Sequence, residues 1–370
     1  MSRVKRVLIV GSGIGGATAA YALRKVGVDV HSIDIKPDTP TAGSGICLLH
    51  NAMRALDSLG LAEPCLDSGF HFNAFRQFNS AGELLQTNPA PPSCGIPRPE
   101  LARILETAAA GAGAILEKGL TIEYLKDRGD CVEVRFSDGR EGIYDLVVAA
   151  DGAYSKLREQ VFGVDCGPRF AGQSVWRFNA PRPDQVDAFC LYRSASGRTV
   201  GSFPTSKDSC YIFFLENSQE PLRIPEGEAH LLIRERLAEY TAPTIRESLE
   251  LVTDAKQIIF RPLDITLVPA PWHLGRVVLL GDAAHAPTPH MTSGGGMAIE
   301  DAVVLAECVA STNSAREALE AYSDRRYDRV KTIYDASMQL CRYEQGDAIG
   351  NRERSSALLL QTYQYLGQPI

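Results

Sequence analysis

The stretch VLIVGSGIGG, residues 7–16, decides how this chain is expected to fold. Its first four residues are apolar and predict a short buried strand, and a helical run follows and ends at Gly27. Gly11, Gly13 and Gly16 lie between them at the G-x-G-x-x-G spacing. In this arrangement the first glycine permits a tight turn, the second lets a pyrophosphate approach the backbone, and the third lets the helix pack closely on the strand. We therefore expect a dinucleotide-binding turn; a glycine-rich turn without a ligand is the alternative.

A second predicted strand, at residues 28–33, strengthens this interpretation because it ends at an acid. Asp34 lies 23 residues after Gly11. This is close to the roughly 20 residues that separate such a turn from the acid that binds the ribose. Strand, glycines, helix, strand and acid in this order favour a nucleotide-binding α/β domain.

Composition limits the remaining possibilities. The 370 residues are 45% hydrophobic and carry a net charge of −7, so two domains with cores of their own are expected. The acidic balance argues against a nucleic-acid partner or an anionic membrane surface, and no apolar run reaches the roughly 18 residues of a membrane span. The nine cysteines form no C-x-x-C pair, so we expect no disulfide framework, no metal site and a cytoplasmic location.

Residues 168–268 differ in composition from the first part of the chain. They are rich in strand formers, and one helix is expected at residues 228–240, which predicts an antiparallel sheet with a covering helix. Alternation along a strand puts Trp176 and Phe178 on one face and Arg177 on the other. The aromatic residues of this segment fit either a core or a pocket, and sequence alone does not select the face that points inward.

Three local features leave their interpretation open. The proline-rich stretch at 89–100 is expected to be a connector, and Arg98 at its end could meet a phosphate or a surface acid. Asn51 lies where a helix N-cap would stand. His50 could be held beside a cofactor loop or be a partly buried structural histidine.

A third informative stretch follows a buried strand at residues 277–280. Asp282 ends that strand, and a loop with Pro289 and three consecutive glycines, Gly294 to Gly296, leads into a long helix. Consecutive glycines before a helix expose backbone N–H groups and let a flat ligand approach the main chain. The alternative is a flexible loop. From about residue 314 onward the chain is expected to be helical.

Taken together, GSGIGG at 11–16, DGAYSKLRE at 151–159 and GDAAHAPTPHMTSGGGMAIEDA at 281–302 resemble the three motifs of the class A flavoprotein aromatic hydroxylases. The resemblance covers about residues 5–345. It implies an α/β fold: a Rossmann-like FAD-binding domain with an inserted, mainly antiparallel substrate domain and C-terminal helices. The expected segments are FAD-binding at 1–71, 91–167 and 269–312, joining strands at 72–90, the substrate domain at 168–268, and a helical segment at 313–370.

The resemblance also implies the residues that bind FAD. The glycines of the first turn would contact the pyrophosphate, Asp34 the ribose and Arg98 the phosphate side. Asp151 belongs to the DG motif, Asp282 would bind the ribityl chain, and the glycine-rich loop would lie beside the flavin ring. The full set is Gly11, Gly13, Gly15, Gly16, Asp34, Arg98, Asp151, Asp282, Pro289, Gly294, Gly295 and Gly296. One departure is that many family members have Gln-Gly where this chain has Ser293-Gly294. His290 also stands in a position that the family fills variably.

The activity that the resemblance implies is hydroxylation of a small aromatic or heteroaromatic substrate with NADH or NADPH and O₂, through a flavin C4a-hydroperoxide. A base with a pKa near 7 would help to ionise a phenol-like substrate, and His290, His50 and Tyr211 are the candidates. The expected substrate contacts are Trp176, Phe178, Tyr192, Tyr211, Phe213 and His290.

Alternatives to a hydroxylase remain. They are a reductase, oxidase or halogenase of the same fold, or a non-catalytic flavin- or ligand-binding protein. Only two tryptophans are present, which disfavours the W-x-W-x-I motif of halogenases. The chain is expected to be a monomer or a homodimer.

Overall fold

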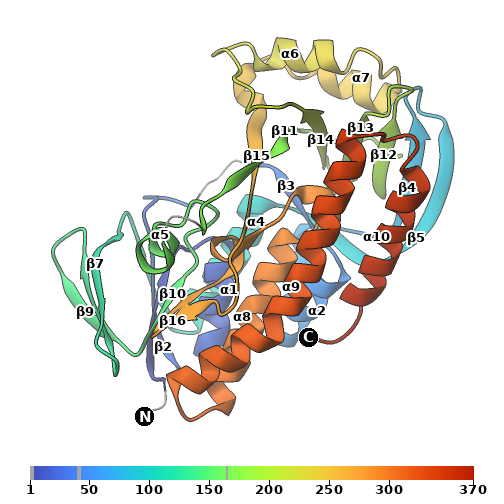
Figure 1. The fold of residues 1–370 in the computed structure, drawn as a ribbon. Helices are drawn as coiled ribbons and strands as arrows, with labels where there is room; N and C mark the ends of the chain where they lie inside the picture. The colour runs from blue at the N-terminus through green and yellow to red at the C-terminus, as the bar shows by residue number, and fades with distance from the viewer. Residues whose placement is uncertain (1–3, 40–42, 164–165) are drawn as a thin grey trace.

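The computed structural model describes residues 4–39, 43–163 and 166–370. Its first layer is a six-stranded sheet in the order β16-β17-β10-β1-β2-β6 (Figure 1). The strands are β1 (Arg6–Val10), β2 (Asp29–Asp34), β6 (Ile115–Lys118), β10 (Leu146–Ala149), β16 (His273–Leu274) and β17 (Val277–Leu279). All neighbours pair in parallel except β16 and β17. The central strand is buried over Val7–Val10, as the apolar start of the glycine stretch predicts.

Helices cover this sheet. α1 (Ile14–Lys25) packs against both α4 (Arg98–Gly111) and α8 (Gly294–Ser311), and α8 packs in turn against α2 (His50–Leu59) and the long α9 (Ala315–Gln345). The carboxyl ends of β1, β2, β10 and β17 meet at one edge of the sheet, where ligands bind in open α/β folds.

The second layer is a nine-stranded, mostly antiparallel sheet in the order β18-β15-β11-β14-β13-β12-β4-β5-β3. Its strands are β3 (Gly45–Leu48), β4 (Phe70–Asn79), β5 (Leu84–Pro97), β11 (Arg169–Pro181), β12 (Phe189–Arg193), β13 (Thr199–Pro204), β14 (Ser209–Asn217), β15 (Ile259–Leu267) and β18 (His285–Ala286). Two helices, α6 (Ala229–Arg236) and α7 (Pro243–Glu250), cover its outer face at the top of Figure 1. The two sheets and their helices confirm the predicted fold class.

Several smaller elements complete the chain. They are α3 (Ala62–Ser68), α5 (Lys156–Phe162), α10 (Arg352–Leu366), the three-stranded sheet of β7 (Ile122–Asp127), β8 (Val132–Phe136) and β9 (Glu141–Tyr144), and the 3₁₀ turns η2 (Ala255–Gln257), η3 (Gly281–Ala283) and η4 (Pro289–Met291). Among the described helices, none is long and apolar enough to cross a membrane.

Three local expectations were wrong. The predicted connector at 89–100 is mostly strand, because β5 pairs with β3 and β4 as far as Pro97. Two helices, not one, interrupt the second sheet, and Pro243 begins the additional helix at a position where its missing N–H costs nothing. Asn51 is not an N-cap: it lies inside α2, fully buried, and donates to Glu300 at 3.2 Å.

Candidate functional site

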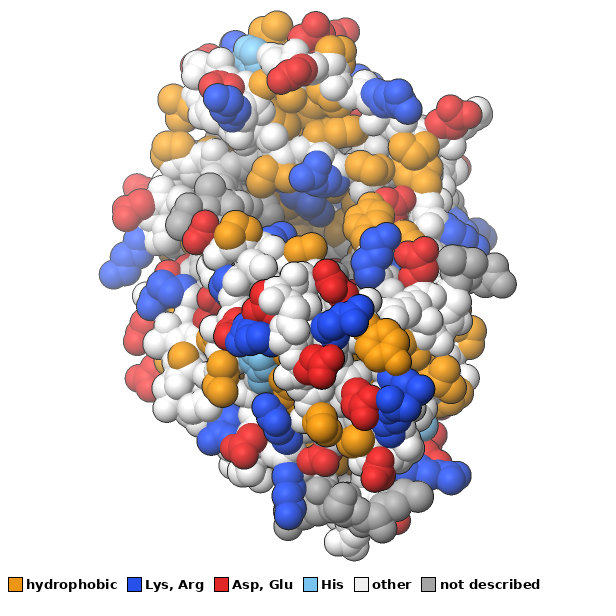
Figure 2. All heavy atoms as spheres, turned by 90° about the vertical axis from the view of Figure 1, so that its left-hand side faces the viewer, with side chains coloured by type: hydrophobic (Ala, Val, Ile, Leu, Met, Phe, Trp, Pro, Cys, Tyr) orange, Lys and Arg blue, Asp and Glu red, His pale blue; other side chains and the backbone are white. Residues whose placement is uncertain are grey.

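One cavity of about 770 Å³ lies between the carboxyl edge of the first sheet and the inner face of the second. Figure 2 shows this side of the molecule hollowed, with cationic and hydrophobic side chains gathered around the hollow. The cavity runs from Ser12 and Asp34 at one end to Pro289 and Gly294 at the other. It therefore joins the glycine turn to the glycine-rich loop, and Gly13 and Gly294 are 281 residues apart in the sequence.

The glycines of the first turn have different structural tasks. Gly11 has φ +100°, and a Cβ there would lie 2.3 Å from the carbonyl oxygen of Ala150. A Cβ on Gly16 would lie 1.9 Å from the Gly11 carbonyl oxygen. Gly13 lines the cavity, and its Cβ would meet nothing within 4 Å. Gly11 and Gly16 thus permit the turn and the helix packing, whereas Gly13 leaves the backbone open to a ligand.

Asp34 lines the same end of the cavity. Its Oδ2 accepts hydrogen bonds from the backbone N–H and hydroxyl of Ser12, at 2.8 and 3.0 Å, and its Oδ1 accepts one from the N–H of Lys36. Burial raises the pKa of this carboxyl, but these hydrogen bonds outweigh it and hold the pKa below the usual value. Asp34 is therefore an ionised acceptor with spare lone pairs.

Sequence reasoning missed a polar cluster beside Asp34. The Lys118 ammonium donates to the Ser12 hydroxyl at 2.5 Å and to Glu106 at 2.6 Å, and Glu106 also accepts from Thr39. All four residues line the cavity. They come from two loops, α4 and β6, so no local motif could have revealed the cluster.

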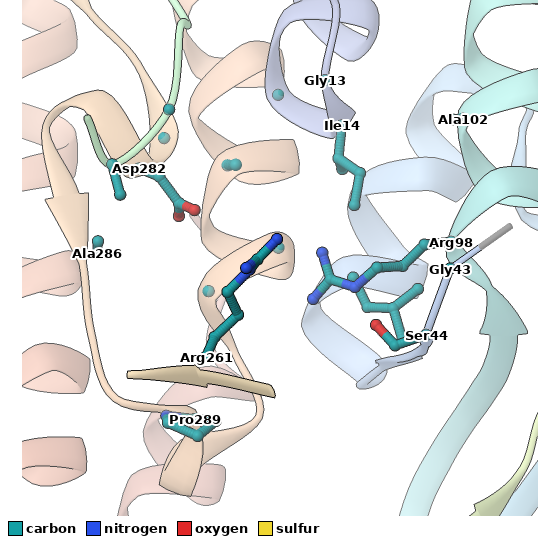
Figure 3. Close-up of a pocket in the computed structure, with 18 of the residues that line it drawn as sticks. Gly13, Ile14, Gly43, Ser44, Arg98, Ala102, Arg261, Asp282, Ala286 and Pro289 are labelled. Atoms are coloured by element: carbon teal, nitrogen blue, oxygen red, sulfur yellow. The ribbon is translucent and has the colours of Figure 1, made fainter. Parts of the chain in front are cut away.

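Charged side chains enter the middle of the cavity from opposite walls (Figure 3). Arg98, at the start of α4, faces Asp282 of η3 and Arg261 of β15. Arg98 and Asp282 interact electrostatically, and none of the ion pairs found among the described residues involves any of these three side chains. The Asp282 side chain is exposed to the cavity but lies deep between the two layers of the molecule, and the resulting desolvation raises its pKa, although His285 and Arg98 oppose this. Desolvation and the nearby Arg177 lower the pKa of Arg98.

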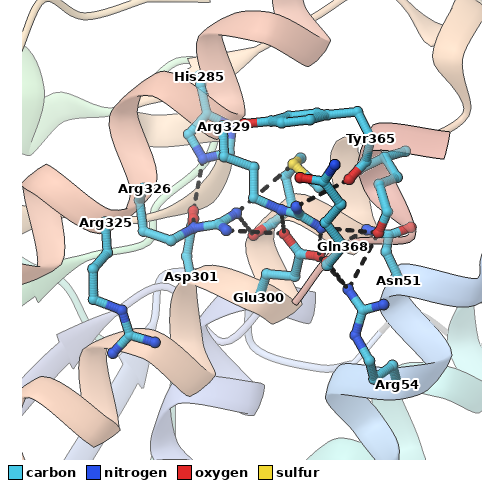
Figure 4. A network of polar contacts seen from close by, with 12 residues as sticks. Asn51, Arg54, His285, Glu300, Asp301, Arg325, Arg326, Arg329, Tyr365 and Gln368 are labelled. Carbon is cyan, nitrogen blue, oxygen red and sulfur yellow. Dashed lines mark hydrogen bonds and ion pairs between the residues drawn. The ribbon is translucent and has the colours of Figure 1, made fainter. Parts of the chain in front are cut away.

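A buried network holds the turn that carries Asp282 (Figure 4). Asp301 of α8 accepts hydrogen bonds from the Gly281 N–H at 3.0 Å, from His285 Nε2 at 2.6 Å and from Arg326 Nε at 2.7 Å. The side chains of Asp301, His285 and Arg326 are fully buried. Burial raises the pKa of Asp301, but His285 and Arg326 outweigh it and lower the pKa.

The same network reaches the end of the chain. Glu300, next to Asp301, pairs with Arg326 and Arg329, both at 2.9 Å. Arg329 and Arg54 also donate to the backbone carbonyl groups at the end of α10 and just after it, at residues 366–368. The C-terminal residues are thus tied to the helix that starts at the glycine-rich loop.

The glycine-rich loop closes the far end of the cavity. Thr292 has φ +53°, the sole positive φ of a non-glycine residue in the described ranges, and its side chain hydrogen-bonds to Tyr363 of α10. Pro289, Gly294 and Gly295 line the cavity. Gly296 does not: a Cβ there would lie 3.2 Å from the side chains of Ala52 and Asn51, so this glycine serves helix packing.

The second sheet turns one face to the cavity. Val175, Arg177, Tyr211, Phe213, Ile259 and Arg261 line it, together with Phe189 and Phe203. In the sheet, Arg177 pairs with Phe213 on one side and Ile259 on the other, so the three side chains share this face. Gly201 makes room for the Phe213 ring, because a Cβ there would lie 2.0 Å from Phe213 Cζ.

Three expected substrate contacts lie on the opposite face. Trp176, Phe178 and Tyr192 pack with Ile233 and Ile245 of the covering helices, and none of the three lines the cavity. The structure thus places these three expected contacts away from the cavity, because α6 and α7 pack on their face of the sheet while alternation along β11 turns Arg177 to the other face. Tyr211 and Phe213 do line the cavity.

Both candidate histidines also lie outside the cavity lining. His290 Nε2 pairs with Glu344 of α9 at 3.0 Å. His50 is the first residue of α2, and its Nε2 lies 3.7 Å from the position that a Cβ on Gly367 would take. Of the three candidate bases, only Tyr211 reaches the cavity.

The Asp151 side chain has a structural task as well. It accepts hydrogen bonds from the N–H groups of Lys156 and Leu157, at 2.9 and 3.3 Å, and so holds the start of α5. Its neighbours Ala150 and Gly152 line the cavity instead. Gly15 also lines the cavity, and a Cβ added there would lie 2.7 Å from Leu280 Cδ2.

The cavity suits a long dinucleotide with a flat ring. Its volume is inside the range of about 300–1,000 Å³ that is usual for cofactor sites. Gly13 offers open backbone at the N-terminus of α1, and the Asp282 carboxylate faces the cavity without an ion-pair partner among the described side chains. These features fit the phosphate and polyol parts of FAD.

Comparison with known proteins agrees with this geometry. Residues 5–337 match the family described as FAD binding domain. The chain is 31% identical over 344 residues to the aurachin C monooxygenase/isomerase of Stigmatella aurantiaca, which covers 90% of this chain and 88% of that protein. It is 29% identical over 353 residues to the FAD-dependent urate hydroxylase of Klebsiella pneumoniae subsp. pneumoniae, covering 91% and 89%.

A solved structure is similar over nearly the whole chain. It is Klebsiella pneumoniae HpxO complexed with FAD and uric acid, with a TM-score of 0.83, 25% identity, and coverage of 98% of this chain and 92% of that one. The family match spans far more than half of the sequence. This chain therefore belongs to the FAD binding domain family and is an FAD-dependent monooxygenase of the class A flavoprotein hydroxylase type.

Proposed function

We propose that this enzyme hydroxylates a small aromatic or heteroaromatic substrate with O₂, using NADH or NADPH as reductant. One observation carries the proposal: a single cavity joins the nucleotide end, at Ser12 and Asp34, to a wall of aromatic side chains beside the glycine-rich loop. The relatives support it, since they include a urate hydroxylase and a 6-hydroxynicotinate 3-monooxygenase. One oxygen atom of O₂ enters the substrate and the other leaves as water, with two electrons from NAD(P)H.

The bound FAD would accept the hydride and activate O₂; the chain's own residues bind, orient and exclude water. We propose that Gly13 and the N-terminus of α1 hold the pyrophosphate, Asp34 the ribose, and Asp282 the ribityl hydroxyls. Gly294 and Gly295 would let the flat ring lie against the main chain.

The aromatic wall would close the reacting end of the cavity. Phe203 packs on both Phe189 and Tyr211, and Tyr211 on Phe213, with ring centroids 5.0 to 5.8 Å apart. Such packed rings form a rigid apolar surface that keeps water away from the reacting centre. Tyr211 is the polar group of this surface. Desolvation raises its pKa, so at neutral pH it is a hydrogen-bond donor.

The test is product analysis with FAD-loaded enzyme, NADH or NADPH, isotopically labelled O₂ and a panel of aromatic acids and azaaromatic compounds. We expect at least one compound to accelerate NAD(P)H oxidation and to gain one labelled oxygen atom. Oxidation of NAD(P)H that yields hydrogen peroxide alone with every compound would indicate an oxidase. If no compound stimulates NAD(P)H oxidation, a ligand-binding role is favoured.

A further inference from the structure

We infer that Ser337 of α9 is a positioning residue for the flavin: its hydrogen bonds fix the backbone of the glycine-rich loop, so that the loop is already in place before FAD binds. The inference rests on the proposed function for one point, that the flavin ring lies against Gly294 and Gly295. Ser337 itself does not line the cavity. It therefore acts on the cofactor through the loop and not by contact.

Reciprocal hydrogen bonds join Ser337 to the loop. Its hydroxyl donates to the carbonyl oxygen of Thr288 and accepts a hydrogen bond from the backbone N–H of Met291 at 3.4 Å. The Thr288 hydroxyl in turn donates to the carbonyl oxygen of Ser337 at 3.1 Å. One residue of α9 thus binds both ends of the segment 288–291.

Burial makes these hydrogen bonds selective for one loop position. Ser337 and Met291 are fully buried, and Thr288 is 3% exposed. A buried carbonyl or N–H group that loses its protein partner has no water to replace it, so its loss is costly. The loop is therefore favoured in the position in which Ser337 satisfies the Thr288 carbonyl and the Met291 N–H together.

The segment that Ser337 holds leads directly into a strained residue. Thr292 follows Met291 and has φ +53°, and its N–H donates to the carbonyl oxygen of Pro289 at 2.8 Å. A β-branched residue is unfavourable in this left-handed region and persists there when its surroundings fix it. Because Pro289 and Met291 both belong to the segment 288–291, the hydrogen bonds of Ser337 help to maintain this conformation.

The strained turn in turn directs the start of α8. The Ser293 hydroxyl donates to the Met291 carbonyl oxygen at 2.6 Å, and the Ser293 carbonyl oxygen accepts from the N–H of Met297 at 2.8 Å. The residues of this loop that line the cavity include Thr288, Ser293, Gly294 and Gly295. A movement at residues 288–291 would thus displace the backbone against which the ring is expected to lie. Groups that are held in place beforehand need no reorganisation when the ligand arrives.

A second contact between α9 and the loop is of a different kind. Glu344, seven residues after Ser337, pairs with the His290 imidazole at 3.0 Å, and its side chain is 21% exposed. This contact joins two side chains and leaves the backbone of the loop unbound. Ser337 is therefore the residue of α9 that determines the path of the main chain.

The same helix supplies a matched control. Ser323 of α9 is also buried, and its hydroxyl accepts a hydrogen bond from the backbone N–H of Trp272 at 2.8 Å. Neither Ser323 nor Trp272 lines the cavity. Ser323→Ala and Ser337→Ala thus remove the same group from the same helix, and each leaves a buried N–H without its partner. Only Ser337→Ala frees the loop.

The experiment combines hydrogen–deuterium exchange at residues 288–297, with and without FAD, and the visible circular dichroism of the bound flavin. In the wild type we expect the loop to be protected before FAD is added. In Ser337→Ala, loop exchange without FAD should be roughly tenfold faster, as for the loss of one hydrogen bond. Its flavin dichroism should change while FAD stays bound. Ser323→Ala should lower the unfolding midpoint but keep wild-type loop exchange and dichroism.

Three results would overturn the inference. One is fast exchange of the loop in FAD-free wild type while β1 stays protected, a measurement that needs no variant to fold. The others are wild-type exchange and dichroism in Ser337→Ala, and an equal change of dichroism in Ser323→Ala. None of these measurements needs a substrate, NAD(P)H or O₂. An enzyme that hydroxylates no aromatic compound would therefore contradict the proposed function and leave the inference standing.

Discussion

The backbone N–H of Gly281 donates a hydrogen bond to the Asp301 carboxylate at 3.0 Å, and both groups are buried. This contact joins the 3₁₀ turn at the end of β17 to the helix that follows the glycine-rich loop. Asp282 comes next in the turn and faces the cavity. The direction of a cavity-facing carboxylate is therefore set by an acid that is absent from the cavity lining.

Asp301→Asn should destabilise the enzyme by about 3–5 kcal/mol, because it removes one partner from a buried ion pair and leaves Arg326 less compensated. The lowered pKa of Asp301 means that its contribution is present at neutral pH and is lost as pH falls through that pKa. Urea unfolding at neutral pH measures the change. Asp335→Asn, which breaks an exposed pair with Lys331, is the control and should cost at most about 1 kcal/mol. If both variants lost the same free energy of unfolding, burial would not explain the importance of the Asp301 ion pair.

Gly13→Val should fold normally and lose FAD. A Cβ at this position meets no protein atom within 4 Å, so the branched side chain would occupy the space expected for the pyrophosphate. FAD content after reconstitution and the unfolding midpoint measure the two effects. Gly111→Val is matched, since its Cβ also meets nothing within 4 Å but lies at the end of α4, outside the cavity lining. Full FAD occupancy in Gly13→Val would show that the phosphate site is elsewhere.

Asp282→Ala should weaken FAD binding about 10- to 100-fold, because a hydrogen bond to a charged group is worth roughly 1.5–3 kcal/mol. The dissociation constant can be followed by the quenching of flavin fluorescence. Asp264→Ala is a suitable comparison: this acid lines the mouth of the cavity and accepts from Tyr154. We expect little change there. An unchanged FAD affinity in Asp282→Ala would exclude the ribityl contact.

Gly201→Val should alter substrate binding and leave FAD content unchanged. The new side chain would collide with the Phe213 ring, whose Cζ is 2.0 Å from the Cβ position, and would push that ring into the cavity. The measurement is the Michaelis constant for the best substrate beside the bound FAD per chain. A variant with a normal Michaelis constant would show that Phe213 does not border the substrate.

His290→Ala should keep FAD, turnover and coupling close to wild type. Its imidazole pairs with Glu344 at 3.0 Å and is absent from the cavity lining, so its loss affects packing between the loop and α9. A stability cost of about 1 kcal/mol is expected, as for a partly buried hydrogen bond whose remaining partner, Glu344, can reach water. Separate assays of NAD(P)H oxidation and product would reveal a catalytic role if hydroxylation fell while FAD remained bound.

Local rules predicted the first part of the site well. The run Val7–Val10 is a buried strand, and Gly11 and Gly16 have conformations or contacts that exclude a side chain. These features depend on neighbours within one strand-turn-helix unit, so their residue types carry the information. The family resemblance and the enzyme class were predicted from three such units and are confirmed.

Partners distant in sequence decided the rest. Periodicity predicted that Arg177 and Trp176 lie on opposite faces of β11, but only the packing of α6 and α7 on one face left Arg177 to the cavity. The His290 side chain pairs with Glu344, which is 54 residues away in the sequence, and Lys118 donates a hydrogen bond to Ser12, which is 106 residues away. The sequence by itself determined the local turns, because their geometry is limited by φ, ψ and the absence of a Cβ. Which side chains line the cavity was decided by the tertiary structure alone, since a two-sided strand offers both faces equally until another layer covers one of them.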